Sequence, residues 1–148
     1  MDGIFIASPF SLQTDFIDVE RIEVLRGPQG TLFGQNSTGG AINVISNKPT
    51  TDERFSKADI TYGDYGMKQL RSSSNIPISD SASTKISFSA MTREGFTENL
   101  LTGQDLDDAH NLSFRADFLI ELSDTSSLRV FGQYANVDRN GVGLTGID

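Results

Sequence analysis

The chain has 148 residues, a hydrophobic share of 36%, a formal net charge of −8 and no cysteine. The acidic balance argues against a nucleic-acid partner, because phosphate binding requires a basic surface. The lack of cysteine excludes a disulfide framework and thiolate metal sites. No apolar run is long enough for a membrane-spanning helix, and the N-terminus lacks the basic start and apolar stretch of a signal peptide.

The first 49 residues are predicted to form short, dissimilar strands and glycine-rich turns. A buried strand is predicted over residues 19–25, and Gly27-Pro28 ends it because proline has no amide donor and restricts the residue before it. A helical turn is expected at 31–33 and a return strand at 41–46. Three glycines in this part permit a positive φ and a close backbone approach: Gly34, Gly39 and Gly40.

From Arg54 onward the chain becomes a series of long alternating segments. They cover approximately 54–62, 67–78, 84–96, 110–122 and 127–138. In the fourth, the even positions from Leu112 to Leu122 are apolar, whereas Arg115, Asp117 and Glu121 are charged. Successive side chains of a strand point to opposite faces, so the pattern predicts an antiparallel sheet with one apolar and one polar face.

The lengths of these segments and of their connections favour a membrane barrel. Barrel strands cross the bilayer with about 9–11 residues, longer than the usual strand of about 5–6. Short polar turns at 79–83 and 123–127 alternate with a longer acidic loop at 97–109, as in outer-membrane barrels. A soluble sandwich also alternates, and periodicity alone does not separate the two. A sheet in lipid must close, so we expect five strands to be an incomplete barrel.

Motifs for catalysis or cofactor binding fail on inspection. Gly34 and Gly39 have the spacing of a phosphate loop, but Gly40 stands where the lysine is required. The glycines from Gly141 to Gly146 have dinucleotide-binding spacing, yet too few residues follow to form the helix that this site needs. His110 is the only histidine, and no metal-ligand spacing occurs. We therefore predict no enzyme, no cofactor and no metal site.

The stretch from Val19 to Pro49 carries the strongest signal. It contains Arg-Ile-Glu-Val at 21–24, Arg-Gly-Pro at 26–28, Phe-Gly at 33–34 and Gly-Gly-Ala-Ile-Asn at 39–43. This series resembles the plug signature of TonB-dependent receptors. Asp2-Gly3 resembles the Asp-Gly that ends an earlier plug strand of that family, and residues 54–66 and 94–96 resemble its early barrel strands.

The resemblance implies a mainly β fold: the C-terminal half of a plug at 1–49, then at 50–148 the first antiparallel strands of a transmembrane barrel of about 22 strands, here truncated. It implies active uptake of a scarce solute across the outer membrane of a Gram-negative bacterium, such as a siderophore, cobalamin, haem or an oligosaccharide. The implied partners are the TonB energy-transducing complex, acting through an N-terminal box missing here, and the membrane lipid. A passive porin or structural barrel is the alternative, and a soluble binding module is a more distant third.

Site residues are also implied by the resemblance. An apical plug loop at 8–16 offers candidate substrate contacts at Ser8, Phe10, Gln13 and Thr14. The arginine of Arg-Gly-Pro, Arg26, is implied to pair with glutamates of later barrel strands, and otherwise to be a solvated charge. The structural signature comprises Arg21, Glu23, Arg26, Gly27, Pro28, Gly34, Gly39, Gly40 and Asn43.

Overall fold

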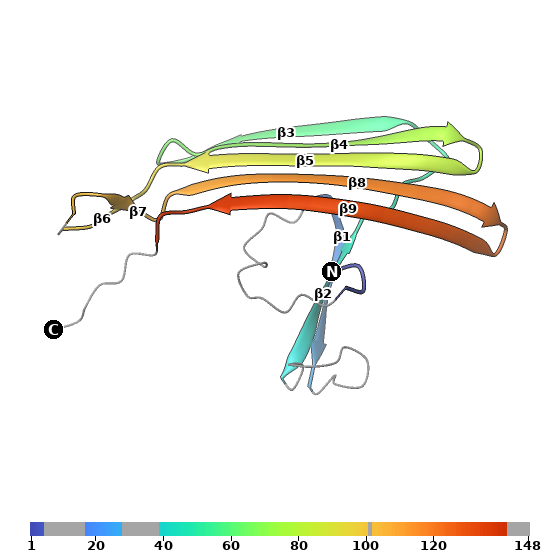
Figure 1. Ribbon diagram of the computed structural model, residues 1–148, viewed down its shortest axis with the longest axis horizontal. Coiled ribbons are helices and arrows are strands. Elements are labelled where there is room, and N and C mark those ends of the chain that lie inside the picture. Colours follow the sequence, from blue (N-terminus) through green and yellow to red (C-terminus); the bar gives the residue numbers. More distant parts are fainter. Residues whose placement is uncertain (5–16, 28–38, 101, 142–148) are drawn as a thin grey trace.

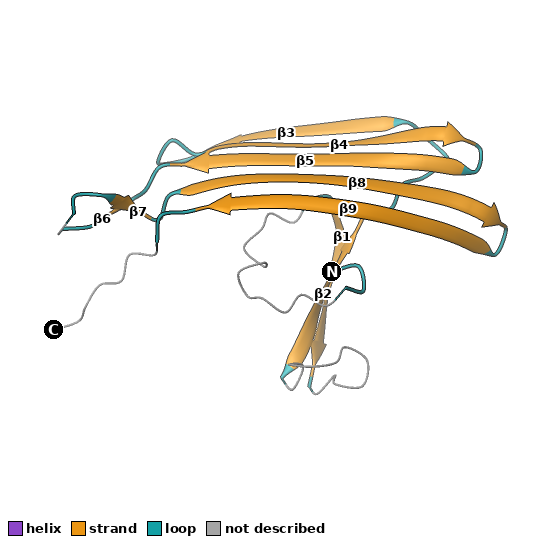
Figure 2. Ribbon diagram, in the orientation of Figure 1, coloured by secondary structure: helices purple, strands orange, loops and turns teal. Residues whose placement is uncertain are grey.

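The computed structural model describes residues 1–4, 17–27, 39–100 and 102–141, and over these residues it consists of strands and loops (Figure 1, Figure 2). An antiparallel hairpin pairs β1 (Val19–Arg26) with β2 (Gly40–Ser46). A separate antiparallel sheet has the strand order β3-β4-β5-β8-β9. Its strands are β3 (Phe55–Tyr62), β4 (Lys68–Ser79), β5 (Ala82–Arg93), β8 (Ala109–Ser123) and β9 (Ser126–Asp138). Over the described residues, no helix is long and apolar enough to cross a membrane.

The five alternating segments predicted from the sequence are confirmed as the five strands of this sheet, with ends that differ by at most three residues. The loop at 97–109 differs from its prediction. It contains a short hairpin of β6 (Thr97–Glu98) and β7 (Asp105–Leu106). Hydrogen bonds from Phe96 N to Leu106 O and from Asn99 N to Gln104 O extend this pairing, so the loop has a folded stem.

Burial in the sheet is the reverse of that in a water-soluble protein. The face turned toward the hairpin, called the inner face here, carries buried polar side chains, including Asn75, Lys85, Ser89, Arg115 and Asp117. The opposite, outer face carries exposed apolar side chains: Ile60, Tyr62, Leu70, Ile86, Leu112, Phe114, Leu128, Val130 and Tyr134. A soluble sandwich would cover such an apolar face with a second sheet. An apolar outside and a polar inside are the pattern of a barrel in lipid.

The register aligns these two faces across every strand. On the outer face Phe114 pairs with Phe88 of β5 and Tyr134 of β9, and Phe118 pairs with Val130. On the inner face one row of paired residues crosses all five strands, from Phe55 through Asn75, Lys85 and Asp117 to Phe131. The prediction that Phe118 and Arg115 lie on opposite faces is therefore confirmed.

Two glycines of the hairpin occupy backbone conformations that other residues rarely adopt. Gly27, directly after β1, has a φ of 84°. Gly40, which begins β2, has a φ of 146°, and a Cβ there would lie 2.5 Å from the carbonyl oxygen of Leu25. Glycine at these positions permits both the turn out of β1 and the tight pairing of the two strands.

Candidate functional site

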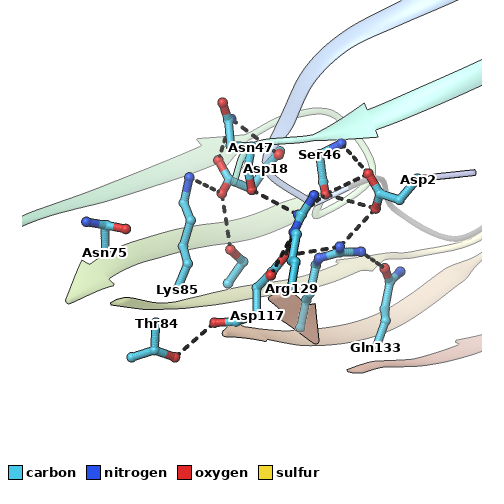
Figure 3. Close-up of polar contacts among 12 residues, drawn as sticks. Asp2, Asp18, Ser46, Asn47, Asn75, Thr84, Lys85, Asp117, Arg129 and Gln133 are labelled. Carbon is cyan, nitrogen blue, oxygen red and sulfur yellow. Dashed lines mark hydrogen bonds and ion pairs between the residues drawn. The ribbon is translucent and has the colours of Figure 1, made fainter. Parts of the chain in front are cut away.

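The hairpin lies against the inner face of the sheet through a cluster of buried and half-buried polar residues (Figure 3). We call it the hairpin–sheet cluster, and it comprises Asp2, Asp18, Ser46, Asn47, Lys85, Arg115, Asp117 and Arg129. The first four belong to the N-terminal part and the last four to strands β5, β8 and β9. Its ion pairs bring three carboxylates together with three cations, so the cluster is electrically neutral.

Asp2 connects β2 of the hairpin to β8 of the sheet. Its carboxylate accepts hydrogen bonds from the Ser46 amide at 2.9 Å and from the Ser46 hydroxyl at 2.9 and 3.0 Å. The same carboxylate pairs with Arg115 Nη2 at 2.8 Å. Burial alone would raise the pKa of Asp2, but the Ser46 hydrogen bonds and the charges of Arg115 and Arg129 outweigh it and lower the pKa below its usual value.

Asp117 holds two arginines together on the inner face. Its carboxylate accepts hydrogen bonds from Arg129 Nε at 2.9 and 3.1 Å and pairs with Arg129 Nη2 and with Arg115 Nη2, the latter at 3.2 Å. Arg129 also donates from Nη2 to the Ser46 hydroxyl at 3.0 Å. The Arg115 guanidinium carbon lies 4.3 Å from the centroid of the Phe131 ring. This cation–π contact packs the guanidinium group against the ring.

Asp18 makes the second connection, to β5. Lys85 Nζ lies 2.6 Å from Asp18 Oδ2, and the two side chains retain 4% and 10% of their exposure. Asn47 donates to the same carboxylate from Nδ2 at 2.9 Å. Asp18 and Asp2 both have left-handed backbones, with φ of 55° and 47°. Aspartate tolerates this conformation better than most residues, so both carboxylates contact the sheet from sharp turns of the chain.

Asn75 fastens the segment that joins hairpin and sheet. It is fully buried. Its side-chain amide donates to the carbonyl oxygens of Thr50 at 2.9 Å and Glu53 at 2.6 Å, and its oxygen accepts from the Thr50 amide at 3.0 Å. One side chain of β4 therefore fixes both ends of residues 50–53.

The residues predicted from the sequence fall into two groups. The substrate contacts predicted at Ser8, Phe10, Gln13 and Thr14, and the signature residues Pro28 and Gly34, lie outside the described residues. The remaining signature residues lie along the hairpin, and none of them is a member of the hairpin–sheet cluster: Arg21, Glu23, Arg26, Gly27, Gly39, Gly40 and Asn43.

Arg21, Glu23 and Asn43 form a polar network on the hairpin. Arg21 Nε donates to Glu23 at 2.9 Å, and Asn43 donates to Glu23 from the paired strand at 3.1 Å. These hydrogen bonds, with that of Arg21 first, lower the pKa of the Glu23 carboxyl. Arg26 is exposed at the end of β1.

Sequence reasoning missed most of the hairpin–sheet cluster as a site. The alternation placed Lys85, Arg115, Asp117 and Arg129 correctly on the polar face, but it could not supply their partners. Arg115 and Asp2 are 113 residues apart in the chain. The signal in the sequence was that three cations, Lys85, Arg115 and Arg129, share the polar face of strands that were expected to surround the plug.

The comparisons with known proteins agree with this geometry. Residues 1–41 match the family model described as the TonB-dependent Receptor Plug Domain. The metal-pseudopaline receptor of Pseudomonas aeruginosa is 25% identical over 135 residues, which are 87% of this chain and 19% of that receptor. The pesticin receptor of Yersinia pestis is 41% identical over 54 residues, 36% of this chain and 8% of the receptor. The ferrichrome outer membrane transporter/phage receptor of Escherichia coli is 47% identical over 34 residues, 23% of this chain and 5% of the transporter.

In its sheet, its docked hairpin and these matches, the chain resembles the TonB-dependent receptors. Its fold is that of a plug domain followed by antiparallel barrel strands, and the hairpin is called the plug hairpin and the sheet the wall from here on. The matched part of the chain spans at most about a fifth of the length of these three relatives, 19% for the Pseudomonas receptor.

Proposed function

We propose that this chain is part of a receptor that imports a scarce solute across the outer membrane of a Gram-negative bacterium, using energy delivered by TonB. The observation that carries the proposal is a wall with an apolar outer face, whose polar inner face holds a plug hairpin by buried ion pairs. A passive porin needs no such docked hairpin. The plug then extends over residues 1–49 and the barrel begins at residue 50.

The proposed cargo is a metal chelate taken up as a small molecule. Support comes from the relatives, whose names specify a metal-pseudopaline receptor, a ferric enterobactin receptor and a ferrichrome transporter. Substrate contacts are proposed at Ser8, Phe10, Gln13 and Thr14. Their joint substitution by alanine in the full-length receptor is expected to weaken chelate binding. Unchanged affinity would remove them from the site.

Uptake by intact cells tests the function. Cells that express the full-length receptor under iron limitation should accumulate radiolabelled ferric siderophore, and an otherwise identical strain without TonB should bind it but not accumulate it. Equal accumulation in both strains would contradict energy-coupled transport and favour a passive barrel. Cells that carry the empty vector provide the background.

Arg26 has a proposed role of its own in holding the plug. A guanidinium can bind two carboxylates at once, and the family resemblance implies glutamate partners on later strands. Replacing Arg26 by alanine in the full-length receptor should let small solutes leak through without energy coupling. A variant that remains as tight as wild type would make Arg26 a surface charge.

A further inference from the structure

One nitrogen of Arg115 contacts a carboxylate of the plug and a carboxylate of the wall. Its Nη2 lies 2.8 Å from Asp2 Oδ2 and 3.2 Å from Asp117 Oδ2. Arg129 repeats this arrangement, because its Nη2 pairs with Asp117 and donates to the Ser46 hydroxyl of β2. Figure 3 shows Ser46 of the plug and Asp117 of the wall on the Arg129 guanidinium group. Plug and wall therefore share the same donors.

Departure of the plug hairpin would leave the wall cations with a partner. Arg115 and Arg129 both already contact Asp117. Lys85 would lose Asp18, but its direct neighbour on β8 is Asp117. The wall thus carries its own counter-ion, paired with two of the cations and opposite the third in the strand register. A buried cation without a counter-ion is costly, and Asp117 reduces this cost at Arg115 and Arg129 on undocking.

We propose that Asp117 is a resident counter-ion that exchanges with Asp2 and Asp18 at the wall cations and so eases undocking of the plug hairpin. The inference rests on the proposed function, in which the plug must move. With the plug docked, the cations divide their hydrogen bonds between plug and wall. With the hairpin displaced, they turn to Asp117, which releases them when the hairpin returns.

The exchange predicts that neutralising Asp117 tightens docking of the hairpin, whereas a role in orienting the arginines predicts that it loosens docking. If Asp117 competes with the plug carboxylates, a neutral residue at 117 leaves Asp2 and Asp18 as the counter-ions of this cluster and holds the hairpin more tightly. If Asp117 only orients Arg115 and Arg129 toward the plug, the same substitution loosens the hairpin. The sign of the change separates these two roles.

Cysteine labelling of the full-length receptor measures undocking directly. Val44 of β2 is buried, and the chain has no cysteine of its own. In a receptor with Val44→Cys, and with any cysteine elsewhere replaced, the rate of maleimide labelling in lipid vesicles reports release of the hairpin. No energy source and no solute are added, so labelling is read independently of transport.

A neutral residue at position 117 should slow labelling. We expect Asp2→Asn to label about tenfold faster than the parent, because it removes the charge-assisted contact of the plug with Arg115. We expect Asp117→Asn to label about tenfold more slowly, because it removes the competing carboxylate at Arg115 and Arg129. Asp117→Glu should restore the parental rate. Asp59→Asn is the matched control, since Asp59 is an exposed carboxylate of the inner face on β3 and should leave the rate unchanged.

Labelling of Asp117→Asn at or above the parental rate would overturn the exchange. If this variant does not insert into vesicles, Asp117→Ser gives the same test with a smaller neutral side chain. Loss of TonB-dependent uptake in the parent receptor would instead overturn the proposed function and leave the labelling order intact. If Asp117→Asn labels faster than the parent while uptake is normal, only the exchange is overturned and the proposed function stands.

Discussion

The plug hairpin takes part in two charged networks, and they differ in burial. Toward the wall, Asp2 and Arg115 retain 4% and 3% of their side-chain exposure at a separation of 2.8 Å. Within the hairpin, Arg21 and Glu23 retain 52% and 39% at a separation of 2.9 Å. The two pairs have nearly equal lengths, so distance does not distinguish them.

Solvent access separates these two pairs in energy. An exposed pair gains little because water and salt screen it and each side chain loses conformational freedom. A buried pair has already lost its hydration, so removing one partner leaves an uncompensated charge. The wall side of the hairpin should therefore be sensitive to single substitutions, and the solvent side should tolerate them.

The largest effect is expected at Arg115. Arg115→Gln should destabilise the docked plug by about 3–5 kcal/mol, because Asp2 and Asp117 lose a buried cationic partner. Urea titration of the full-length receptor, followed by Val44→Cys labelling, measures this change. Arg21→Gln is the matched control on the exposed side. Equal stability of both variants would contradict the distinction by burial.

Next in size is a charge on the outer face of the wall. Phe118→Arg should cost about 2–4 kcal/mol if the site lies near the middle of the bilayer. Folding of the full-length barrel into lipid vesicles, titrated with denaturant, gives the value. Phe118→Leu should fold like wild type. An arginine tolerated as well as leucine would mean that this face does not contact lipid.

A backbone effect should follow at Gly40. Gly40→Ala should destabilise the hairpin by about 1–3 kcal/mol, because strained backbone conformations carry costs of that size. The new methyl group would also meet the Leu25 carbonyl oxygen. Gly39→Ala is the control, since a Cβ there meets no atom within 4 Å. Amide exchange of β1 and β2 should accelerate in the first variant and not in the second.

Acid should weaken the plug contact through Asp2. Its pKa is lower in the docked state than in the unfolded chain. The contribution of Asp2 is therefore present above the usual aspartate pKa of about 3.9 and is lost as the pH falls through the lowered folded value. Labelling of Val44→Cys with an acid-compatible thiol reagent should rise in this range. The rise in labelling rate should be smaller when Asp2→Asn is added. An equal rise would mean that other carboxylates cause the acid sensitivity.

The smallest effect is expected at the exposed pair. The pKa of Glu23 is lowered mainly by the hydrogen bond from Arg21, yet water surrounds both groups. Glu23→Gln should leave the urea midpoint of plug release within experimental error of wild type. A clear shift would mean that the solvent side of the hairpin contacts another part of the full-length receptor.

Local pattern explains why the sheet was predictable. Alternation of Phe114 with Arg115 and of Val130 with Arg129 fixes which side chains share a face, and short polar turns fix antiparallel order. The β6–β7 hairpin escaped prediction because it has only two residues in each strand. Such short pairing leaves no periodicity to detect.

The site was less predictable because its partners are distant in sequence. Asp2 was recognised only as part of an Asp-Gly pair, and no local pattern connects it to Arg115. Asp18 was not selected, although its left-handed backbone places its carboxylate beside Lys85. Such contacts depend on how the hairpin docks against the sheet, which periodicity does not describe.

The attachment made by Asn75 sets a radius for any motion of β2. Four residues lead from Ser46 to Thr50, where the chain is bonded to Asn75. A fully extended chain reaches about 3.5 Å per residue, so this connecting segment can span about 14 Å. While Asn75 holds Thr50, the end of β2 can swing only within that distance of the wall. A larger movement of β2 requires the Asn75 hydrogen bonds to break. Asn75→Ala would therefore lengthen the free segment between β2 and the wall.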